Sequence, residues 1–319
     1  MRDLVAETQL DVRQLVAPLF VREGIDQAQP VASLPGVMQH TRASLREEVR
    51  QLADLGVRAV ILFGVPEVKD DLGSGAFDPQ GIVQVALREL SADVGDRMVL
   101  MADLCVDEYT SHGHCGVLDG PAGHPHTSVD NDATLEIYGR IAVAQADAGA
   151  QVVAPSGMMD GQVGAIRAAL DGAGHSSTAI LAYSAKYASG LYGPFRDAVD
   201  CAILGGGDRK SYQQDWRNAR EALVEVHADI SQGADMVMVK PALSYLDIIA
   251  AVKAAVDVPV AAYHVSGEYA MIKAAAANGW IDHDAVAGEQ LTAIRRAGAD
   301  VILTYLARWY AQAAAGKAR

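Results

Sequence analysis

Short apolar runs rich in β-branched residues recur along the whole chain, and a longer segment rich in Ala, Leu, Glu and Arg follows most of them. The runs predict eight strands, at residues 15–21, 57–63, 98–103, 151–154, 179–184, 236–240, 258–264 and 300–305. Helices are predicted at, among others, 44–55, 132–148, 218–231, 245–256 and 284–297. Glycines stand where four of these helices should end, at Gly56, Gly149, Gly233 and Gly298. This alternation predicts an α/β fold, a (β/α)8 TIM barrel, and the alternative is a doubly wound open sheet.

The chain reads as a single domain over residues 1–319, because no low-complexity linker or change in composition divides it. Residues 1–14 precede the first strand and are expected to form a short N-terminal arm. Two connections, at 104–131 and 187–216, are too long for ordinary barrel loops. Both follow the C-terminal ends of strands, where barrel enzymes carry their chemistry, so we expect both to be functional.

Charge and cysteine content narrow the class of protein. The net charge of −14 disfavours binding to nucleic acid or to anionic membranes, and no stretch has the ~18 uninterrupted apolar residues of a membrane span. The three cysteines, Cys105, Cys115 and Cys201, argue against a disulfide framework. Since the first residues also lack the apolar core of a signal peptide, the expected location is the cytoplasm.

Two lysines close apolar strands, Lys186 after the fifth predicted strand and Lys240 at the end of the sixth. An apolar barrel mouth disfavours the charged amine, and a second ammonium nearby would lower the pKa further. A neutral lysine can attack a ketone and form an imine. The alternative is a lysine paired with a strand-end carboxylate, but two lysines on adjacent strands favour catalysis.

The segment DLCVDEYTSHGHC at residues 103–115 brings together two thiols, a carboxylate and two imidazoles. Cys105 and Cys115 suit a borderline-soft metal such as zinc, although their spacing is not that of a structural zinc finger. Asp107 makes the ligand set harder, so magnesium or a weakly held zinc is an alternative metal for this site. The alternative is two free cysteines in a mobile loop.

The connection 187–216 combines glycines, including Gly205, Gly206 and Gly207, with Arg196 and Arg209. Glycines give mobility, and arginines can bind a carboxylate through two parallel hydrogen bonds. We interpret this segment as an active-site lid that closes over an anionic substrate.

Four stretches together resemble the porphobilinogen synthase family, also called 5-aminolevulinate dehydratase: APSGMMDG at 154–161, YGPFR at 192–196, MVKP at 238–241 and YHVSGEY at 263–269. The resemblance extends over nearly the whole chain. It implies a barrel enzyme of tetrapyrrole (heme) biosynthesis that condenses two 5-aminolevulinate molecules into porphobilinogen and releases two waters.

The resemblance also implies a role for individual residues. Lys240 matches the lysine that holds the first substrate as an imine, and Lys186 matches the second active-site lysine. The remaining matches bind substrate: Ser266 and Tyr305 the first carboxylate, Arg196, Arg209 and Gln213 the second substrate, and Asp103 and Ser156 the reacting amino and keto groups.

This chain departs from the family pattern in three places. Zinc-dependent members have three cysteines where this chain has Cys105, Asp107 and Cys115, so its metal set is intermediate between the zinc and magnesium types. The N-terminal arm, which wraps a neighbouring subunit in the family, is short, and a homo-octamer, hexamer or dimer is expected. Gly157 occupies a position that is Asp in many members.

Glu225, on the helix before the sixth predicted strand, resembles the position of an allosteric magnesium site in some bacterial members; the alternative is an ordinary solvated helix face. Two other functions compete with the family assignment. A different Schiff-base barrel, such as an aldolase, would explain Lys240 but neither the second lysine nor the thiol loop. A non-catalytic metal store would bind metal without turnover.

Overall fold

A closed barrel of parallel strands forms the centre of the computed structural model, which describes residues 1–124, 126–204 and 207–317. The barrel strands, in order, are β1 (Leu15–Arg22), β4 (Ala59–Val65), β5 (Val99–Leu104), β6 (Val152–Pro155), β7 (Ala179–Lys186), β8 (Met236–Lys240), β9 (Val260–His264) and β10 (Val301–Thr304). β10 pairs with β1 through Leu15↔Ile302 and Val16↔Leu303, which closes the sheet. The eight predicted strands are therefore confirmed, and the fold is the TIM barrel rather than the open sheet.

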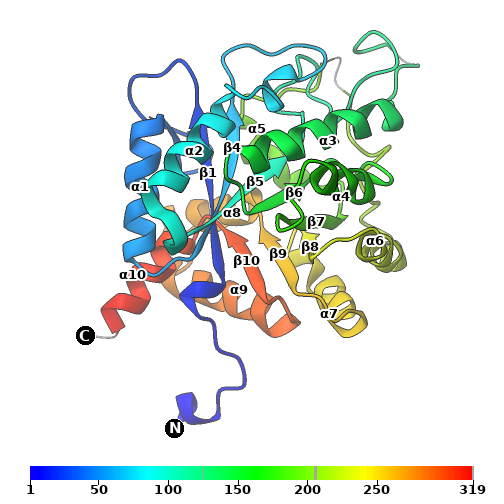
Figure 1. Ribbon diagram of the computed structural model, residues 1–319. Coiled ribbons are helices and arrows are strands. Elements are labelled where there is room, and N and C mark those ends of the chain that lie inside the picture. Colours follow the sequence, from blue (N-terminus) through cyan, green and yellow to red (C-terminus); the bar gives the residue numbers. More distant parts are fainter. Residues whose placement is uncertain (125, 205–206, 318–319) are drawn as a thin grey trace.

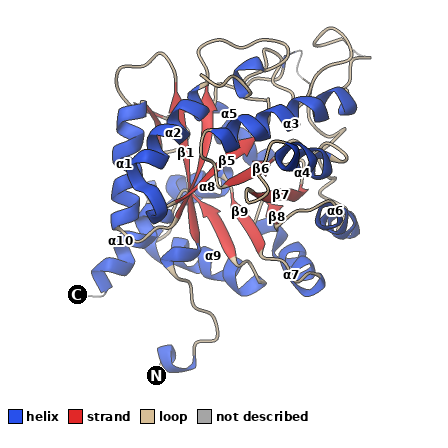
Figure 2. Ribbon diagram, in the orientation of Figure 1, coloured by secondary structure: helices blue, strands red, loops and turns tan. Residues whose placement is uncertain are grey.

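Helices surround the strands on the outside of the barrel (Figures 1 and 2). They are α1 (Arg42–Asp54), α2 (Ile82–Val94), α3 (Asn131–Asp147), α4 (Gln162–Gly172), α6 (Arg220–Ser231), α7 (Leu246–Ala255), α8 (Ser266–Ala277), α9 (His283–Ala297) and α10 (Ala307–Lys317). Side-chain caps start three of them: Thr41 accepts from the Ser44 N–H, Asp130 from the Ala133 N–H, and Asp282 from the Ala285 N–H. The four predicted stop glycines all adopt positive φ, from 93° at Gly56 to 120° at Gly298, so they end their helices as expected.

The barrel strands are buried on both faces, as in β4, where every residue is buried. This double burial explains why the strands read as continuous apolar runs rather than as an alternating pattern. Several polar residues are buried where strands end, among them Asp103, Ser156, Lys186, Lys240 and Ser266 at the barrel mouth. The loops that follow β1, β4 and β5 lie at the top of Figure 1.

A small hairpin-like addition was not predicted. β2 (Gln29–Pro30) pairs with β3 (Met38–His40), and β3 pairs in parallel with the end of β1 through Phe20↔Gln39. These two- and three-residue strands have no apolar run of their own, so the sequence carries no strand signal for them.

Residues 1–14 extend away from the bottom of the barrel in Figure 1 and contain two short 3-10 turns, Arg2–Val5 and Val12–Gln14. Tyr310 of α10 donates its hydroxyl to the Leu10 carbonyl at 2.6 Å, which ties the arm to the body. Leu4 and Val5, near the tip, are exposed.

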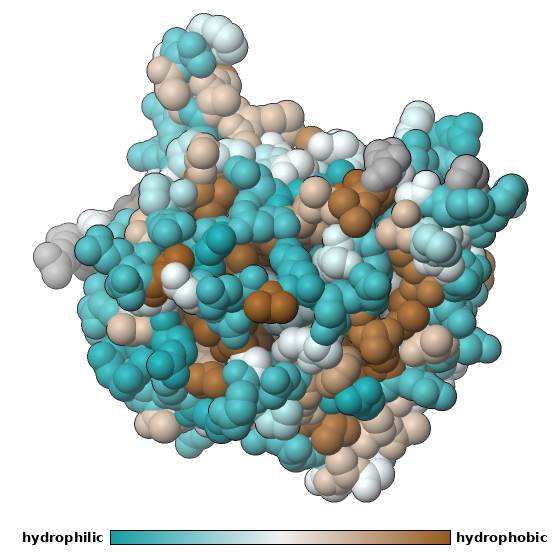
Figure 3. Space-filling model, turned by 90° about the horizontal axis from the view of Figure 1, so that it is seen from above, coloured by the Kyte–Doolittle hydropathy of each residue, from teal (hydrophilic) through white to brown (hydrophobic). Residues whose placement is uncertain are grey.

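The surface seen from above is mainly hydrophilic, with hydrophobic residues in patches between the polar ones (Figure 3). Among the described residues, none of the helices has both the length and the apolar character that a bilayer crossing requires.

The connection after β7 is partly ordered into secondary structure. It contains a 3-10 turn at Gly190–Tyr192 and α5 (Gly193–Ala198). Lys69 donates to the Val199 and Asp200 carbonyls at 3.2 and 2.8 Å, and Gln39 donates to the Ala198 carbonyl at 2.7 Å. The end of α5 is thus fastened to the β1–β4 side of the barrel. Gly205 and Gly206, predicted to belong to the lid, lie outside the described residues.

Candidate active site

The two strand-end lysines are direct neighbours in the sheet. Lys186 and Lys240 are register partners on β7 and β8, and both side chains are buried. Lys186 donates a hydrogen bond from Nζ to the Ser156 carbonyl. The prediction that both lysines lie on adjacent strand ends is confirmed, so two amines open into the same barrel mouth.

Aromatic rings enclose the Lys240 amine. Its Nζ lies 4.4 Å from the ring centre of Tyr263, and 4.9, 5.3 and 5.4 Å from those of Tyr183, Tyr192 and Phe195. Burial lowers the pKa of Lys240 to about 7 and the Lys186 ammonium adds to this, whereas the carboxyl groups of Asp103, Asp107 and Glu108 act in the opposite direction. A substantial fraction of Lys240 is therefore neutral near pH 7, as attack on a ketone requires.

Asp103, at the end of β5, raises the pKa of Lys240 more than any other carboxyl group does. Its Oδ2 accepts a hydrogen bond from the Ser156 hydroxyl at 3.0 Å, and its Oδ1 has no partner among the described residues. Burial raises the pKa of Asp103, although Lys240 opposes the change. The Tyr183 ring centre lies 4.9 Å from Lys240 Nζ and 5.8 Å from Lys186 Nζ, and its buried hydroxyl likewise has no partner in the described part of the chain. These groups can exchange protons with a ligand bound beside the lysines.

Three residues of the lid segment, Arg196, Arg209 and Gln213, line one cavity of about 450 Å³ beside α5. Each carries a buried nitrogen that finds no partner within the described part of the chain: Nε of both arginines and Nε2 of Gln213. Buried donors are normally paired, so these nitrogens fit an acceptor-rich ligand such as a carboxylate. A larger and mostly apolar groove of about 620 Å³, formed by α3, α4 and Phe77, contains no predicted site residue, so volume alone does not mark the site.

Ser266 and Tyr305 follow the neighbouring strands β9 and β10. In this structure the Ser266 hydroxyl accepts from the Phe195 N–H at 3.0 Å and lies 3.3 Å from the Leu191 carbonyl, so it is joined to the lid backbone. The Tyr305 hydroxyl lies 3.4 Å from that of Tyr263, which is also the ring nearest Lys240. Ser266 therefore contacts the lid backbone, and Tyr305 contacts one of the aromatic rings that enclose the Lys240 amine.

The loop after β5 forms a compact candidate metal centre. One ligand atom each from Cys105, Asp107 and Cys115 lies within 4.8 Å of the others, and all three residues are buried. Two sulfurs and a carboxylate fit zinc with a coordination position left for a ligand. Among the described residues no other group of three such side chains comes this close, so the structure brings together the three predicted ligands.

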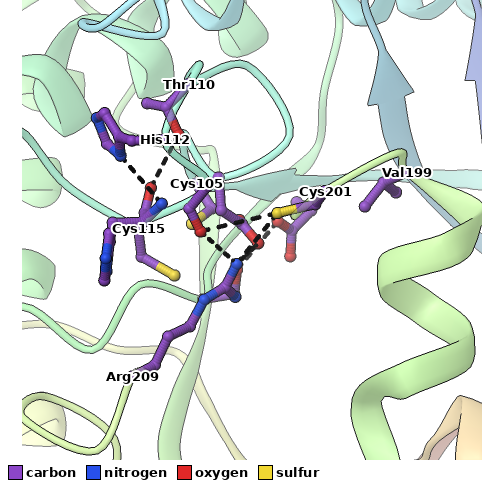
Figure 4. A network of polar contacts seen from close by, with 12 residues as sticks. Cys105, Thr110, His112, Cys115, Val199, Cys201 and Arg209 are labelled. Carbon is purple, nitrogen blue, oxygen red and sulfur yellow. Dashed lines mark hydrogen bonds and ion pairs between the residues drawn. The ribbon is translucent and has the colours of Figure 1, made fainter. Parts of the chain in front are cut away.

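Arg209 joins this centre to the lid (Figure 4). Its Nη2 pairs with the Asp107 carboxylate at 2.8 Å and donates to the Gly113 carbonyl at 2.7 Å, with the Cys201 sulfur at 3.3 Å. Burial would raise the pKa of Asp107, but Arg209 and Lys186 outweigh it and hold that pKa at about 2.

The two thiols titrate differently. A hydrogen bond from Cys105 lowers the pKa of Cys115 to about 7, with help from Arg209. Burial and the same hydrogen bond raise the pKa of Cys105. Cys115 therefore ionises more readily than Cys105.

Glu225 lies apart from this centre, on α6. Together with Asp160, Glu221 and parts of the lid segment it lines a pocket of about 470 Å³. Burial raises the pKa of Glu225, and the nearby Asp160 and Glu221 carboxylates add to the effect. An acidic pocket of this kind can take a cation.

Sequence reasoning missed the aromatic enclosure of Lys240, because nothing in the pattern of an apolar strand tells which aromatic residue faces the barrel axis. It also missed Glu108, which is 2% exposed and has one oxygen unpaired within the described residues, and Cys201, which contacts Arg209. Glu108 could have been singled out by its place beside Asp107, whereas Cys201 carries no local signal.

Comparison with known proteins identifies the family. Residues 1–313 match the family model described as delta-aminolevulinic acid dehydratase. Relatives of that name from Mycobacterium leprae and Streptomyces coelicolor are each 58% identical over 309 residues, which is 96% of this chain and 92% of theirs. A solved delta-aminolevulinic acid dehydratase (porphobilinogen synthase) from Toxoplasma gondii, in complex with the reaction product porphobilinogen, matches with a TM-score of 0.94 and 43% identity over 98% of this chain and 87% of that one. The resemblance seen in the sequence is thereby confirmed, and the chain belongs to the delta-aminolevulinic acid dehydratase family.

Proposed function

We propose that this protein is a porphobilinogen synthase, which condenses two 5-aminolevulinate molecules into porphobilinogen and releases two waters in tetrapyrrole (heme) biosynthesis. The observation that carries the chemistry is the register pairing of Lys186 and Lys240 in one buried mouth. Two ketone substrates call for two amines, whereas an aldolase needs one. Family membership supports the same reaction.

The lysines supply the covalent chemistry in this proposal. The neutral Lys240 amine attacks the ketone of the first substrate, and loss of water leaves an imine. Lys186 forms the corresponding imine with the second substrate. Each imine withdraws electrons from its neighbouring carbon, which can then lose a proton and attack the other substrate.

The remaining polar groups bind and orient the substrates. We assign the first carboxylate to Ser266 and Tyr305, the second substrate to Arg196, Arg209 and Gln213, and the reacting amino and keto groups to Asp103 and Ser156. The unpaired buried nitrogens of the lid support the second assignment. Residues 187–216 act as the lid that excludes water, with α5 as its fastened end.

Cys105, Asp107 and Cys115 would hold the metal, which we propose to be zinc, with magnesium as the alternative because of the carboxylate. When bound, such an ion polarises a ketone oxygen or lowers the pKa of a water molecule. Arg209 and the Asp107 carboxylate keep the site compact and exclude solvent beside the second substrate. We propose Glu225 as a ligand of a separate regulatory magnesium.

The organisation of the molecule completes the proposal. Residues 1–319 form one domain, and the arm at residues 1–14 contacts another copy in a homo-oligomer, which is an octamer, a hexamer or a dimer. The exposed Leu4 and Val5 support such a contact. The enzyme works in the cytoplasm, on a small-molecule substrate, and binds neither nucleic acid nor membrane.

Two experiments test this function. Incubation with 5-aminolevulinate should give a pyrrole that reacts with Ehrlich's reagent, and borohydride should trap a substrate adduct on Lys240, which mass spectrometry locates. Lys240→Ala should abolish both while circular dichroism stays unchanged. Pyrrole formation by a folded Lys240→Ala protein would overturn the assignment of Lys240, and metal binding without any pyrrole would favour a metal store.

A further inference from the structure

Gly157 follows Ser156 at the barrel mouth, and the position of Tyr138 explains why this residue is a glycine. A Cβ atom at this position would lie 1.7 Å from the Tyr138 hydroxyl oxygen and 2.6 Å from the ring carbon that carries it. No side chain fits there while Tyr138 keeps its place. Glycine therefore stands here in place of the family's aspartate because Tyr138 occupies the space that a side chain would need.

Tyr138 uses this space to reach both thiol residues. Its hydroxyl donates to the Cys115 carbonyl at 2.6 Å and lies 3.7 Å from the Cys105 sulfur. Tyr138 is fully buried, as are both cysteines. One hydroxyl group thus contacts the two residues that would share a metal ion, although they stand ten positions apart.

The helix that carries Tyr138 fastens the same loop at a second point. Thr134, one turn earlier on α3, accepts a hydrogen bond from the Val117 N–H at 3.0 Å. A second tyrosine also contacts Cys115: the Tyr212 hydroxyl accepts from the Cys115 N–H at 3.4 Å. Tyr212 belongs to the lid segment, whereas Tyr138 and Thr134 belong to α3, so the Tyr138 contact to Cys115 comes from the barrel scaffold and not from the lid.

We propose that Tyr138 is a positioning residue of the metal centre. Seated in the space left by Gly157, its hydroxyl holds Cys105 and Cys115 at the separation that one metal ion needs. Groups that orient metal ligands commonly contribute 10- to 100-fold to affinity, because an ion binds more tightly to ligands that are already in place. The inference rests on the proposed metal site at Cys105, Asp107 and Cys115.

Tyr138→Phe tests it, since only the hydroxyl is removed. The dissociation constant for zinc, measured by competition with a chromophoric chelator, should rise roughly 10- to 100-fold. With cobalt(II) in place of zinc, the sulfur-to-metal charge-transfer band should change in energy or intensity. Imine formation between Lys240 and 4-oxopentanoate, trapped with borohydride, should be unchanged.

Tyr310→Phe is the matched control. It also removes a tyrosine hydroxyl that donates to a carbonyl at 2.6 Å, but that carbonyl belongs to Leu10 in the arm. Zinc affinity should stay at the wild-type value. Equal zinc affinity and an identical cobalt spectrum in Tyr138→Phe and wild type would overturn the role of Tyr138, whereas a wild-type protein that binds no zinc or cobalt would overturn the metal site itself, and this inference with it.

Gly157→Ala gives a second route to the same result. The added methyl group must displace the Tyr138 hydroxyl and the end of its ring, since it would lie 1.7 Å from the hydroxyl oxygen and 2.6 Å from the ring carbon that carries it, so this variant should also lose zinc affinity. If both variants act through that hydroxyl, Gly157→Ala should cost less in the Tyr138→Phe background than alone. Independent, multiplicative losses in the double variant would contradict the shared route.

Discussion

Replacement of Lys186 by methionine should raise the pH at which Lys240 forms an imine. Burial and the Lys186 ammonium lower the pKa of Lys240 to about 7. Methionine keeps much of the volume of the lysine side chain and removes its charge, so the repulsion between the two amines disappears. Lys240 then holds its proton more tightly, and its neutral fraction at pH 7 falls.

The structure sets the size of this effect. Nζ of Lys186 and of Lys240 lie 5.8 and 4.9 Å from the same Tyr183 ring centre, so they are at most about 11 Å apart. At an effective dielectric constant of ~20, two unit charges at that distance repel by about 1.5 kcal/mol, or about one pKa unit. The pKa of Lys240 should therefore move to about 8 or above, and its neutral fraction at pH 7 should fall from roughly one half to about a tenth or less.

The assay is imine formation with 4-oxopentanoate, the substrate without its amino group, so no turnover is needed. Borohydride trapping at a series of pH values, quantified by mass spectrometry on Lys240, gives the apparent pKa in wild type and in Lys186→Met. Lys253→Met is the control, because it removes one charge that is paired with Asp300. An unchanged midpoint in Lys186→Met, or a wild-type midpoint above pH 9, would refute the reasoning.

Three further predictions concern the metal centre and the acidic pocket. Cys115→Ala should weaken zinc binding and make activity depend on added metal; activity that resists both this change and strong chelators would show that the loop is not catalytic. Arg209→Met leaves the buried Asp107 carboxylate without its partner, so the metal-free protein should lose about 3–5 kcal/mol in the free energy of unfolding by urea. The loss should shrink when zinc is bound, and an equal loss in both forms would contradict the shared role of Asp107. Glu225→Gln should abolish any stimulation by magnesium at fixed zinc, and a wild-type protein that magnesium does not stimulate would remove Glu225 from the list of metal ligands.

Much of the barrel could be predicted from the sequence because its signals are local. The run at residues 59–65 is apolar throughout, which is typical of a strand buried on both faces. Helix ends are marked by single residues, such as Gly298 at a stop, whereas the start of α1 at Arg42, capped by Thr41, lies two residues before the predicted start at residue 44. β2 and β3 escaped prediction since strands this short depend on their pairing with β1 rather than on their own composition.

Some functional residues also carry a local signal in the sequence, whereas their partners do not. Lys186, Lys240 and Asp103 could be named because each is a charged group that closes an apolar run, and strand ends meet at one mouth in a barrel. The Cys105–Cys115 loop could be named because its ligands are close in sequence. The partners of these groups could not, since they come from elements far along the chain.

The sequence by itself determined the alternation of strands and helices, the polar residues at the strand ends and the family. Only the tertiary structure decided that residues 15 and 302 pair to close the barrel, that Lys186 lies in register with Lys240, and that Arg209 pairs with Asp107. It also explained Gly157, through a tyrosine nineteen positions earlier. The physical reason is range: propensity, capping and burial act over a few residues, whereas register, ion pairing and the fit of one side chain against another depend on where distant segments are packed.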